Sequence, residues 1–363
     1  MNSIPSPSFT RESNGKRAVD IPLMLDTAPA MDTLRSDAYF CFDDYFVSEL
    51  CQTWPMRRLQ RIGFLGAIDY LRKGSGRSPH RRRHNRFEHS LGVARLAEAY
   101  ALHRGLSGND RRLLVAAALL HDIGHGPLSH TLEPVFEEEF GINHHRMTQR
   151  IIRGETKFGD SIGRTLRSHS VDPEEVIALI EGLHDGPLNF LFGSHINLDT
   201  LEGITRSRAF FGRRTAFGSA LTLTERLSKL DELPTSELDD FWRLKHSVYN
   251  LFITANVGLA LDSVAQAYMR DNISKFNEDD FLSTEHSLRI KHPYMFEIIK
   301  MVACGTRNIE KEISKNWLSV VFPFKRRAFF IDCNESLSDT SAINRRYLQS
   351  KTKSSVRLED IIT

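Results

Sequence analysis

The sequence predicts a mainly α-helical protein, a helical bundle followed by a small α+β extension. From about residue 43 onward, apolar residues recur at spacings of three and four, which is the period of a helix with one buried face. The run Leu113–Leu120 is apolar on all sides, as expected for a helix at the centre of a domain. Before residue 310 no series alternates with the period of a strand, and the best strand candidate is "WLSVVFPFKRRAFFIDC" at 317–333.

Seven helices are predicted in order. The first, at 87–105, has Gly105 as its stop, and the second follows Asn109 or Asp110 as its cap. Further periodic segments cover 131–140, 144–153, 172–184, 198–209 and 238–270. The stretches "HDGPLNFLFGSH" (184–195) and "RRTAFGSALT" (213–222) predict loops because of their Gly and Pro content.

Three parts of the chain differ in composition. Residues 1–36 are rich in Ser, Pro, Asn and charge and predict a flexible N-terminal arm. Residues 37–270 hold the predicted bundle, and residues 271–363 predict a C-terminal extension that serves as an interface, a lid or a regulatory element.

The bulk composition excludes several classes of protein. The 363 residues are 40% hydrophobic and 26% charged, with a net charge of only +2, so overall charge favours no particular partner. No apolar run reaches the roughly 18 to 20 residues that span a bilayer, and the N-terminus lacks the apolar core of a signal peptide. The four cysteines are scattered without a C-x-x-C pair, which predicts reduced thiols and a cytoplasmic location.

The segment "LLHDIGHGPLSH" (119–130) places three histidines and an aspartate at the end of the apolar helix. His121 and Asp122 are adjacent, so they point about 100° apart and can reach one ion only at a helix end. Gly124, Gly126 and Pro127 end the helix here. Unpaired charged groups in such an apolar setting are costly, so these side chains either pair with one another or hold a metal.

Two other segments add to this group. His89 lies on the preceding helix, which most simply packs antiparallel to the apolar one, with Arg86 three residues earlier on the same side. Asp199 stands in the otherwise apolar stretch "INLDTLEGITRS". Two imidazoles and two carboxylates suit Mn, Fe, Zn, Ni or Mg, with positions left for water and a substrate oxygen. The alternative is a buried polar network without metal.

These segments resemble the HD-domain phosphohydrolase superfamily, whose H…HD…D order is spelled by His89, His121–Asp122 and Asp199. "RRLQRIGFLG", "RFEHSLGVARLA" and "LLHDIGHGPLSH" are similar to the deoxynucleoside triphosphate triphosphohydrolase branch over about residues 56–210. The resemblance implies an HD-domain bundle with a divalent metal ion, a nucleotide substrate and homo-oligomeric assembly. The metal ligands it implies are His89, His121, Asp122 and Asp199, and the catalytic residues are His125, His130, Glu133 and His145.

Roles follow for some of these side chains. Glu133, three residues after His130, is placed to fix its tautomer and raise its pKa, so that His130 acts as general acid. His125 and His145 would contact phosphate oxygens, although His144 competes with His145, which could instead bind a second metal. Two arginines are the expected phosphate contacts: Arg86 as a bidentate clamp, and Arg206 because it lies two turns beyond Asp199.

The sequence departs from this branch at the positions that select the substrate. The Gln, Tyr and Asp that read the deoxyribose are here Phe64, Gly203 and Ser207. A phosphate-contacting Lys is Thr200, and an acidic residue is Arg146. A site without polar readers of a hydroxyl loses its discrimination for it. Besides a triphosphohydrolase, the sequence therefore allows a phosphodiesterase or phosphomonoesterase acting on cyclic, oligomeric or modified nucleotides, or a non-catalytic nucleotide or nucleic-acid binding module.

A local basic run, "SPHRRRHNR", contains Arg81, Arg82 and Arg83. It is either a solvated loop or a weak contact for polyphosphate or single-stranded nucleic acid. No aromatic residues are interleaved with it, which disfavours a dedicated nucleic-acid platform.

Overall fold

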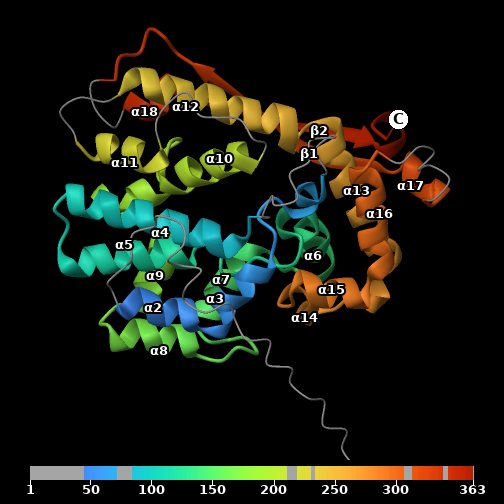
Figure 1. Ribbon diagram of the computed structural model, residues 1–363, viewed down its shortest axis with the longest axis horizontal. Coiled ribbons are helices and arrows are strands. Elements are labelled where there is room, and N and C mark those ends of the chain that lie inside the picture. Colours follow the sequence, from blue (N-terminus) through green and yellow to red (C-terminus); the bar gives the residue numbers. More distant parts are fainter. Residues whose placement is uncertain are drawn as a thin grey trace, which may run out of the picture. The chain divides into compact units, whose positions relative to one another are not determined.

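The centre of the fold is the antiparallel pair α4 (Arg86–His103) and α5 (Gly108–Leu120), as the sequence predicts. In this computed structural model, α5 lies between α4 and α9 (Pro173–Ile180), and α10 (Leu198–Phe210) packs against α4 (Figure 1). Every residue from Leu113 to Leu120 is buried. The structure describes residues 45–71, 84–210, 219–229, 234–305, 313–337 and 342–362, all within one compact unit, Asp44–Thr363.

Local sequence explains where the central helices begin and end. The Asn85 side chain accepts a hydrogen bond from Glu88 N at the start of α4, and Gly105 follows its end with a left-handed φ of 61°. Ser107 caps α5 by accepting from Asp110 N, so the prediction of Asn109 or Asp110 as the cap was wrong. The hydroxyl of Ser107, two residues before Asn109, already accepts the hydrogen bond of the free backbone amide of Asp110.

The other predicted helices of the bundle are present with shifted ends. They are α6 (Glu133–Phe140), α7 (His144–Ile152), α9 and α10. The short helices that were not predicted include α8 (Ser161–Ser168) and α11 (Ala220–Ser228). Shorter elements complete this part, namely α2 (Tyr45–Gln52), α3 (Trp54–Arg58), η1 (Leu59–Arg61), η2 (Gly66–Tyr70), η3 (Ser129–Thr131) and η4 (Gly186–Leu191).

The single long helix predicted over 238–270 is two helices. α12 (Thr235–Val248) runs into a π-helical turn, η5 (Tyr249–Ile253), and α13 (Asn256–Asp271) leaves it at a bend of 52°. The bend brings the carbonyl oxygen of Phe252 against Gly258, where a Cβ would lie only 2.4 Å away. Apolar periodicity runs through both helices, so it does not reveal this break. In the described part of the chain no single helix is long and apolar enough to cross a membrane, although this bent pair together meets that length and composition.

The C-terminal part wraps one end of the bundle and then forms a long hairpin. α14 (Glu278–Phe281), α15 (Glu285–Lys291) and α16 (Pro293–Ala303) follow α13, and α16 packs along it. Strands β1 (Val321–Ile331) and β2 (Tyr347–Arg357) then pair antiparallel, with Val321 opposite Arg357 and Ile331 opposite Tyr347. The remaining short elements are η6 (Ile273–Lys275), α17 (Lys315–Ser319), α18 (Ile343–Arg346) and η9 (Leu358–Asp360).

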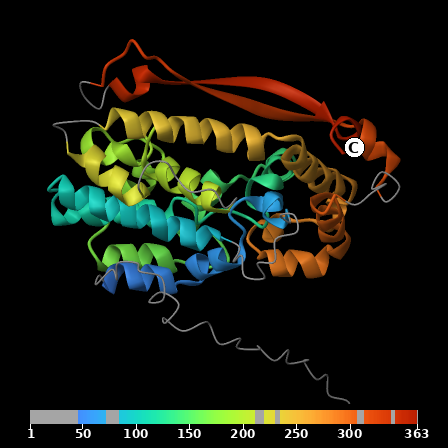
Figure 2. The same ribbon diagram turned by 45° about the horizontal axis from the view of Figure 1, so that its top comes forward.

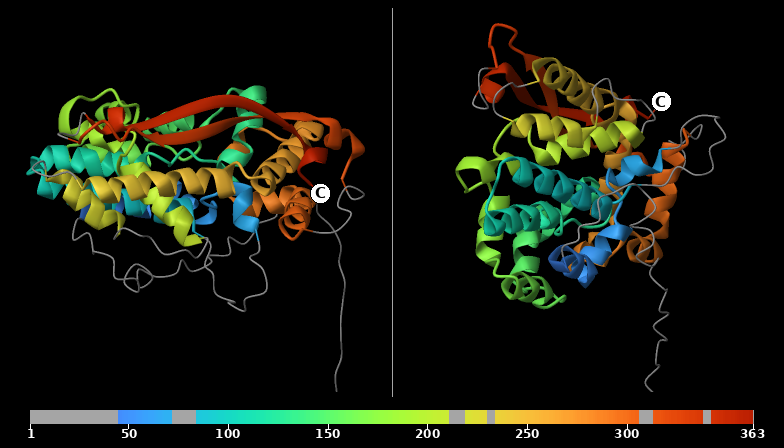
Figure 3. Two further views of the ribbon diagram at one scale, coloured as in Figure 1. Left: turned by 90° about the horizontal axis from the view of Figure 1, so that it is seen from above. Right: turned by 60° about the vertical axis from the view of Figure 1, so that its left-hand side comes forward.

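This hairpin, which we call the ribbon, runs along α12 (Figures 2 and 3). The Trp242 indole donates a hydrogen bond to Phe330 O, and Arg346 pairs with Asp239 at 2.8 and 3.0 Å. β1 matches the predicted strand; β2 was not predicted because its centre, "SKTKSS", has no apolar alternation. The fold is therefore mainly α with a small α+β extension, as predicted. The predicted arm at 1–36 lies outside the described residues, and the division at residue 270 stays a prediction.

Candidate metal centre and histidine cluster

The four predicted metal ligands converge where α4, α5 and α10 meet. His89 comes from α4, His121 and Asp122 follow the last turn of α5, and Asp199 lies in the first turn of α10. Oδ1 of Asp199 lies 3.1 Å from Nε2 of His89 and 3.5 Å from Nε2 of His121. Oδ2 of Asp122 lies 3.5 Å from the same nitrogen of His89. Two imidazoles and two carboxylates thus face one small space.

Both imidazoles are held with Nε2 turned into that space. His121 Nδ1 lies 2.8 Å from Ala118 O, which fixes its proton on Nδ1, and its buried Nε2 has no hydrogen-bond partner among the described residues. Nδ1 of His89 lies 2.5 Å from Oε2 of Glu202. Imidazoles whose outer nitrogens are hydrogen-bonded and whose inner nitrogens point into one space with carboxylates are the arrangement of metal-binding histidines. The unpartnered nitrogen and the donor set therefore fit a divalent cation.

The electrostatics of this centre also favour a cation. Burial alone would lower the pKa of His89, but Glu202, Asp199 and Asp122 outweigh it and raise the pKa to about 9. Burial would raise the pKa of Asp199, but the neighbouring imidazoles of His121 and His89 hold it well below its usual range. The carboxylates thus stay ionised and make the space attractive to positive charge.

Arg86 forms a buried ion pair with Asp122. It is 5% exposed, and its NH1 donates to Oδ2 of Asp122 at 2.7 Å while its Nε donates to Ser129 Oγ at 3.0 Å. Its guanidinium also lies over the ring of Phe64, 5.1 Å from the centroid. The structure thus places Arg86 beside the metal centre, and its predicted contact with phosphate stays a prediction.

Arg206 contacts the metal centre only through Glu202, which holds His89. Its Nε donates to Oε1 of Glu202 at 2.8 Å, its NH1 lies 3.0 Å from Nδ1 of His84, and its NH2 donates to Glu88 O at 3.0 Å. All three guanidinium nitrogens are therefore engaged by the protein. Helical spacing correctly puts Arg206 near Asp199, but the intervening Glu202 takes the guanidinium. This geometry favours a role in positioning Glu202 over the predicted contact with phosphate.

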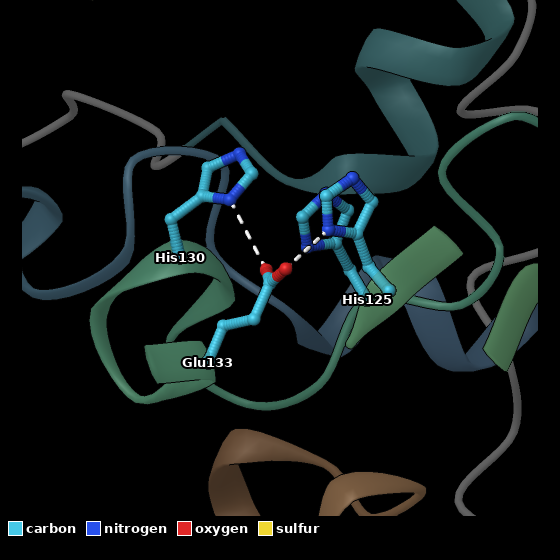
Figure 4. Close-up of side chains that lie close together, drawn as sticks. His125, His130 and Glu133 are labelled. Atoms are coloured by element: carbon cyan, nitrogen blue, oxygen red, sulfur yellow. Dashed lines mark hydrogen bonds and ion pairs between the residues drawn. The ribbon is translucent and has the colours of Figure 1, made fainter. Parts of the chain in front are cut away.

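A second group of side chains lies next to the metal centre (Figure 4). His130 Nδ1 lies 3.2 Å from one oxygen of Glu133, and His144 Nδ1 lies 2.7 Å from the other. The rings of His125 and His144 stack with centroids 4.2 Å apart. His125 connects the two groups, since its Nε2 lies 3.2 Å from Oδ1 of Asp122. The ligand atoms of His125, His130, Glu133 and His144 lie within 4.8 Å of one another.

The loop that presents His130 has an uncommon backbone. Leu128 and Ser129 have left-handed φ values of 59° and 47°, which cost energy for residues other than glycine. The Ser129 hydroxyl donates to Gly63 O at 2.6 Å, and the Thr131 hydroxyl donates to Oδ1 of Asp262 at 2.6 Å. These bonds from both sides of the loop hold it in place.

His144, and not His145, contacts Glu133. The ring of His145 lies beside that of His144, with centroids 4.0 Å apart, but its side chain is exposed. Asn143 caps α7, so the two following histidines point in different directions and only the first enters the cluster. The prediction of His145 as the third histidine of this group is thus not what the contacts favour.

The protonation of the cluster also differs from the prediction. Glu133 was expected to raise the pKa of His130; instead, desolvation in the crowded cluster lowers that pKa, although the Glu133 hydrogen bond acts in the opposite direction. Burial, together with the charge of Arg86, holds the pKa of His125 well below its ordinary value. The side chain of His130 is 64% exposed, so its ring is accessible from solvent and can exchange a proton with it.

The positions that depart from the triphosphohydrolase pattern offer little polarity to the centre. The Phe64 ring packs on His89 with centroids 4.7 Å apart. A Cβ on Gly203 would lie 3.6 Å from both of these rings, and the Ser207 hydroxyl donates to Gly203 O at 2.7 Å. The Thr200 hydroxyl is bonded to the backbone of Asn197. Arg146, on the far side of α7, donates to Gly141 O.

Sequence reasoning missed two polar side chains of this region, Glu202 and Asp262, and named His144 only as a competitor of His145. Glu202 lies one helical turn after Asp199, so the same spacing argument that selected Arg206 could have found it. His144 was passed over for its neighbour, with no local signal to decide between them. Asp262 lies 131 residues after Thr131, and no pattern in the sequence connects the two. Arg81, Arg82 and Arg83 lie outside the described residues.

Comparison with known proteins agrees with this geometry. Residues 86–206 match the model of the HD domain family. YwfO, an uncharacterised protein of Bacillus subtilis, is 32% identical over 174 residues, which are 47% of this chain and 37% of that protein. The uncharacterised MG461 homolog of Mycoplasma pneumoniae is 30% identical over 198 residues, covering 50% of this chain and 43% of the relative. Human deoxynucleoside triphosphate triphosphohydrolase SAMHD1 is 30% identical over 154 residues, which are 38% of this chain and 23% of that protein.

Each match spans less than half the length of the relative. The family match begins at Arg86, just before His89, and ends at Arg206, just after Asp199 and Glu202, so it encloses the whole metal centre. The region that it covers is also the region in which the predicted ligands meet. Residues 86–206 of this chain are therefore similar to the HD domain family.

Proposed function

We propose that this protein is a metal-dependent phosphohydrolase of nucleotides. In its specific form, it hydrolyses a deoxynucleoside triphosphate to the deoxynucleoside and triphosphate. The observation that carries the proposal is the buried, unpartnered Nε2 of His121, which faces Asp199, Asp122 and His89. The names of the human and other relatives support the nucleotide substrate.

The residues of the centre would divide the work as follows. His89, His121, Asp122 and Asp199 would hold the cation, Glu202 and Ala118 O would orient the two imidazoles, and Arg86 would orient Asp122. A divalent cation there supplies Lewis acidity toward a phosphoryl oxygen and makes water a better nucleophile. Metal analysis of the protein would identify the cation among Mn, Fe, Mg, Zn and Ni, and would show whether a second ion binds.

The reaction breaks the bond between the α-phosphorus and the 5′ oxygen, while the oxygen of water forms a new bond to that phosphorus. The departing oxygen needs a proton. His130 is the candidate donor in its protonated form, in which Glu133 accepts a hydrogen bond from Nδ1 and the proton on Nε2 is available to the leaving oxygen. The buried His125, between Asp122 and His144, is placed to donate a hydrogen bond to a phosphate oxygen.

A product assay tests this proposal. Purified protein with Mn²⁺ or Mg²⁺ meets each deoxy- and ribonucleoside triphosphate, and products are separated by chromatography and identified by mass spectrometry. Asp199→Ala serves as the inactive variant and Asp185→Ala, at an exposed position before η4, as the matched control. Nucleoside plus triphosphate in wild type and Asp185→Ala, but not in Asp199→Ala, is expected. Metal-loaded protein without activity on any mono-, di-, tri- or cyclic nucleotide would contradict the proposal.

Two alternative functions that the sequence allows can be distinguished from the proposed one by their products. The apolar contact of Phe64 with His89 and the bare Gly203 favour a phosphodiesterase or phosphomonoesterase that does not read the deoxyribose hydroxyl. Turnover of cyclic or oligomeric nucleotides, with triphosphates untouched, would identify it. A non-catalytic binding module would instead show nucleotide or nucleic-acid binding and no metal-dependent product.

The finer parts of the proposal are a cytoplasmic location, homo-oligomeric assembly, manganese as the metal and a weak nucleic-acid contact through Arg81, Arg82 and Arg83. The scattered cysteines, which are free where the structure describes them, support the first, and the resemblance to the triphosphohydrolase branch supports the second. Light scattering at several protein concentrations measures assembly directly.

A further inference from the structure

The ribbon carries a concentration of positive charge. β1 contains Lys325, Arg326 and Arg327, β2 contains Lys351, Lys353 and Arg357, and neither strand has an acidic residue. The register sets Lys325 opposite Lys353 and Arg327 opposite Lys351. Like charges directly opposite each other on one face of a strand pair are destabilising. Such an arrangement is expected where an anion occupies that face.

From Arg327 onward, the face that carries these pairs turns toward the helices. NH1 of Arg327 donates to the Tyr249 hydroxyl at 3.0 Å, and the guanidinium lies over the Tyr249 ring at 5.1 Å. Two residues along the same strand, Phe329 packs on Trp242 with ring centroids 5.2 Å apart. Because directly opposed residues share a face, Lys351 lies on this side with Arg327.

A third cation meets this face from α12. Lys245 is only 4% exposed, and its Nζ donates to His195 O at 2.9 Å and lies 4.7 Å from the centre of the Trp242 ring. These partners are neutral. Within the described ranges, no ion pair with a carboxylate is formed by Lys245, Arg327 or Lys351. A buried lysine without a carboxylate is rare in proteins.

This cation group adjoins the metal centre. His195, which anchors Lys245, lies four residues before Asp199, at the start of α10. Burial, with repulsion from Arg327 and Lys351, lowers the pKa of Lys245 to about 7, while Asp199 acts to raise it. Asp199 also acts on the pKa of Tyr249. Lys245 is thus near enough to Asp199, Arg327 and Lys351 to interact with the charge of each.

Protection of exposed strand edges explains only part of this charge. Natural proteins place lysines on edge strands to prevent pairing with other chains, and the exposed Lys325 and Lys353 fit that role. Lys245 is on a helix and buried, and Arg327 is half-buried against Tyr249, so neither guards an edge.

We propose that Lys245, Arg327 and Lys351 form an anion subsite at the rim of the metal centre, which binds the distal phosphates of a nucleoside polyphosphate. The inference rests on the proposed function, because it assumes that the substrate's reacting phosphate lies at the metal centre. Phosphate oxygens would pair with Arg327, Lys351 and the protonated form of Lys245, which form no ion pair within the described residues. The C-terminal ribbon is then part of the active site.

Direct binding tests the subsite without turnover. Inorganic tripolyphosphate is titrated into wild type, Arg327→Ala and Arg326→Ala, each fully loaded with metal, at two salt concentrations by calorimetry. Arg326 is a matched control because it is adjacent in sequence, opposite Thr352 on the other face of the ribbon. We expect about tenfold weaker binding for Arg327→Ala, as for loss of one charged hydrogen bond, and wild-type binding for Arg326→Ala. Equal affinity in these two variants would overturn the proposal.

Lys351→Ala provides a second variant that folds even if Arg327→Ala does not, because Lys351 is exposed. It should also weaken tripolyphosphate binding, and thermal unfolding checks each variant. If wild type turns over nucleotides, Arg327→Ala should raise KM for triphosphates about tenfold and leave KM for monophosphates unchanged. Tripolyphosphate that activates turnover instead of competing with substrate would overturn the inference, since the anion would then act as an effector.

Failure of this inference can be separated from failure of the proposed function. No metal-dependent product from any nucleotide contradicts the function, whatever the calorimetry shows. Turnover of triphosphates with identical KM in wild type, Arg327→Ala and Lys351→Ala contradicts only the subsite.

Discussion

Oε2 of Glu202 lies 2.5 Å from Nδ1 of His89, while Nε2 of the same ring lies 3.1 Å from Asp199. One carboxylate thus holds the outer edge of the imidazole and leaves the inner edge for the metal centre. This relationship makes Glu202 a determinant of metal affinity, although it contacts the space between the ligands only through His89.

Glu202→Gln should weaken metal binding by about 10- to 100-fold, the usual effect of losing a partner that orients a ligand. The affinity is measured by competition with a fluorescent chelator, and Glu98→Gln on the same bundle serves as control, since Glu98 pairs with Arg111 away from the centre. An unchanged affinity in Glu202→Gln would mean that His89 is oriented by the fold alone.

Arg206→Ala separates positioning from phosphate binding. Because all three nitrogens of Arg206 bond to Glu202, His84 or Glu88, we expect lower metal affinity and a lower kcat at a limiting metal concentration, with KM for the nucleotide unchanged at saturating metal. A raised KM at saturating metal, with normal metal affinity, would instead show that Arg206 contacts phosphate.

His144→Ala and His145→Ala form a natural pair. His144 bonds to Glu133 and stacks on His125, whereas His145 is exposed beside it. Loss of His144 should lower kcat by about 10²- to 10³-fold, the lower part of the range for a proton-transfer group, because His125 and Glu133 lose their contact. Loss of His145 should change kcat less than about threefold, a free-energy difference below 1 kcal/mol. Equal losses would reject this assignment.

Asp262 predicts a pH dependence of stability. Burial raises its pKa to about 6, despite the hydrogen bond from Thr131. The folded state therefore binds more protons than the unfolded state between about pH 4 and pH 6, and this carboxyl contributes a loss of stability as pH rises through that window. Asp262→Asn should be more stable than wild type above pH 6 by about 1–3 kcal/mol, with the difference vanishing near pH 4.

Urea unfolding of both proteins at pH 4, 5, 6 and 7 measures this difference. Asp240→Asn, at a half-exposed position on α12, is the control and should show no such trend. The amide oxygen of the substituted side chain can still accept from the Thr131 hydroxyl, so the change removes the charge and keeps that bond. A difference that is constant across pH would contradict the assignment.

The parts of this protein that were predictable from sequence depend on local pattern. The apolar run Leu113–Leu120 and the adjacent His121–Asp122 pair define a buried helix with polar groups at its end, and both are as predicted. The bend before α13 was not predictable, because it depends on the approach of Phe252 O to Gly258. β2 was missed because its sequence has no apolar alternation; it is a strand because it pairs with β1.

The roles of side chains in the site depend on contacts between distant segments. His89 on α4 is more than a hundred residues from Asp199 and Glu202 on α10. Only the packing of these two helices shows that Asp199 contacts one nitrogen of the His89 ring and Glu202 the other. Arg206 illustrates the limit: helical spacing brought it close to Asp199, but the choice between substrate and Glu202 was made by tertiary structure.

The separation between His89 and Asp199 along the chain has a consequence for how the protein acquires its metal. Contacts across 110 residues close late in folding, because the chain entropy of such a loop is lost before the contact forms. The set of four ligands is therefore complete only when α4 and α10 have docked. Metal should slow unfolding much more than it accelerates folding, so that metallation is a final step of maturation and not a nucleus for it.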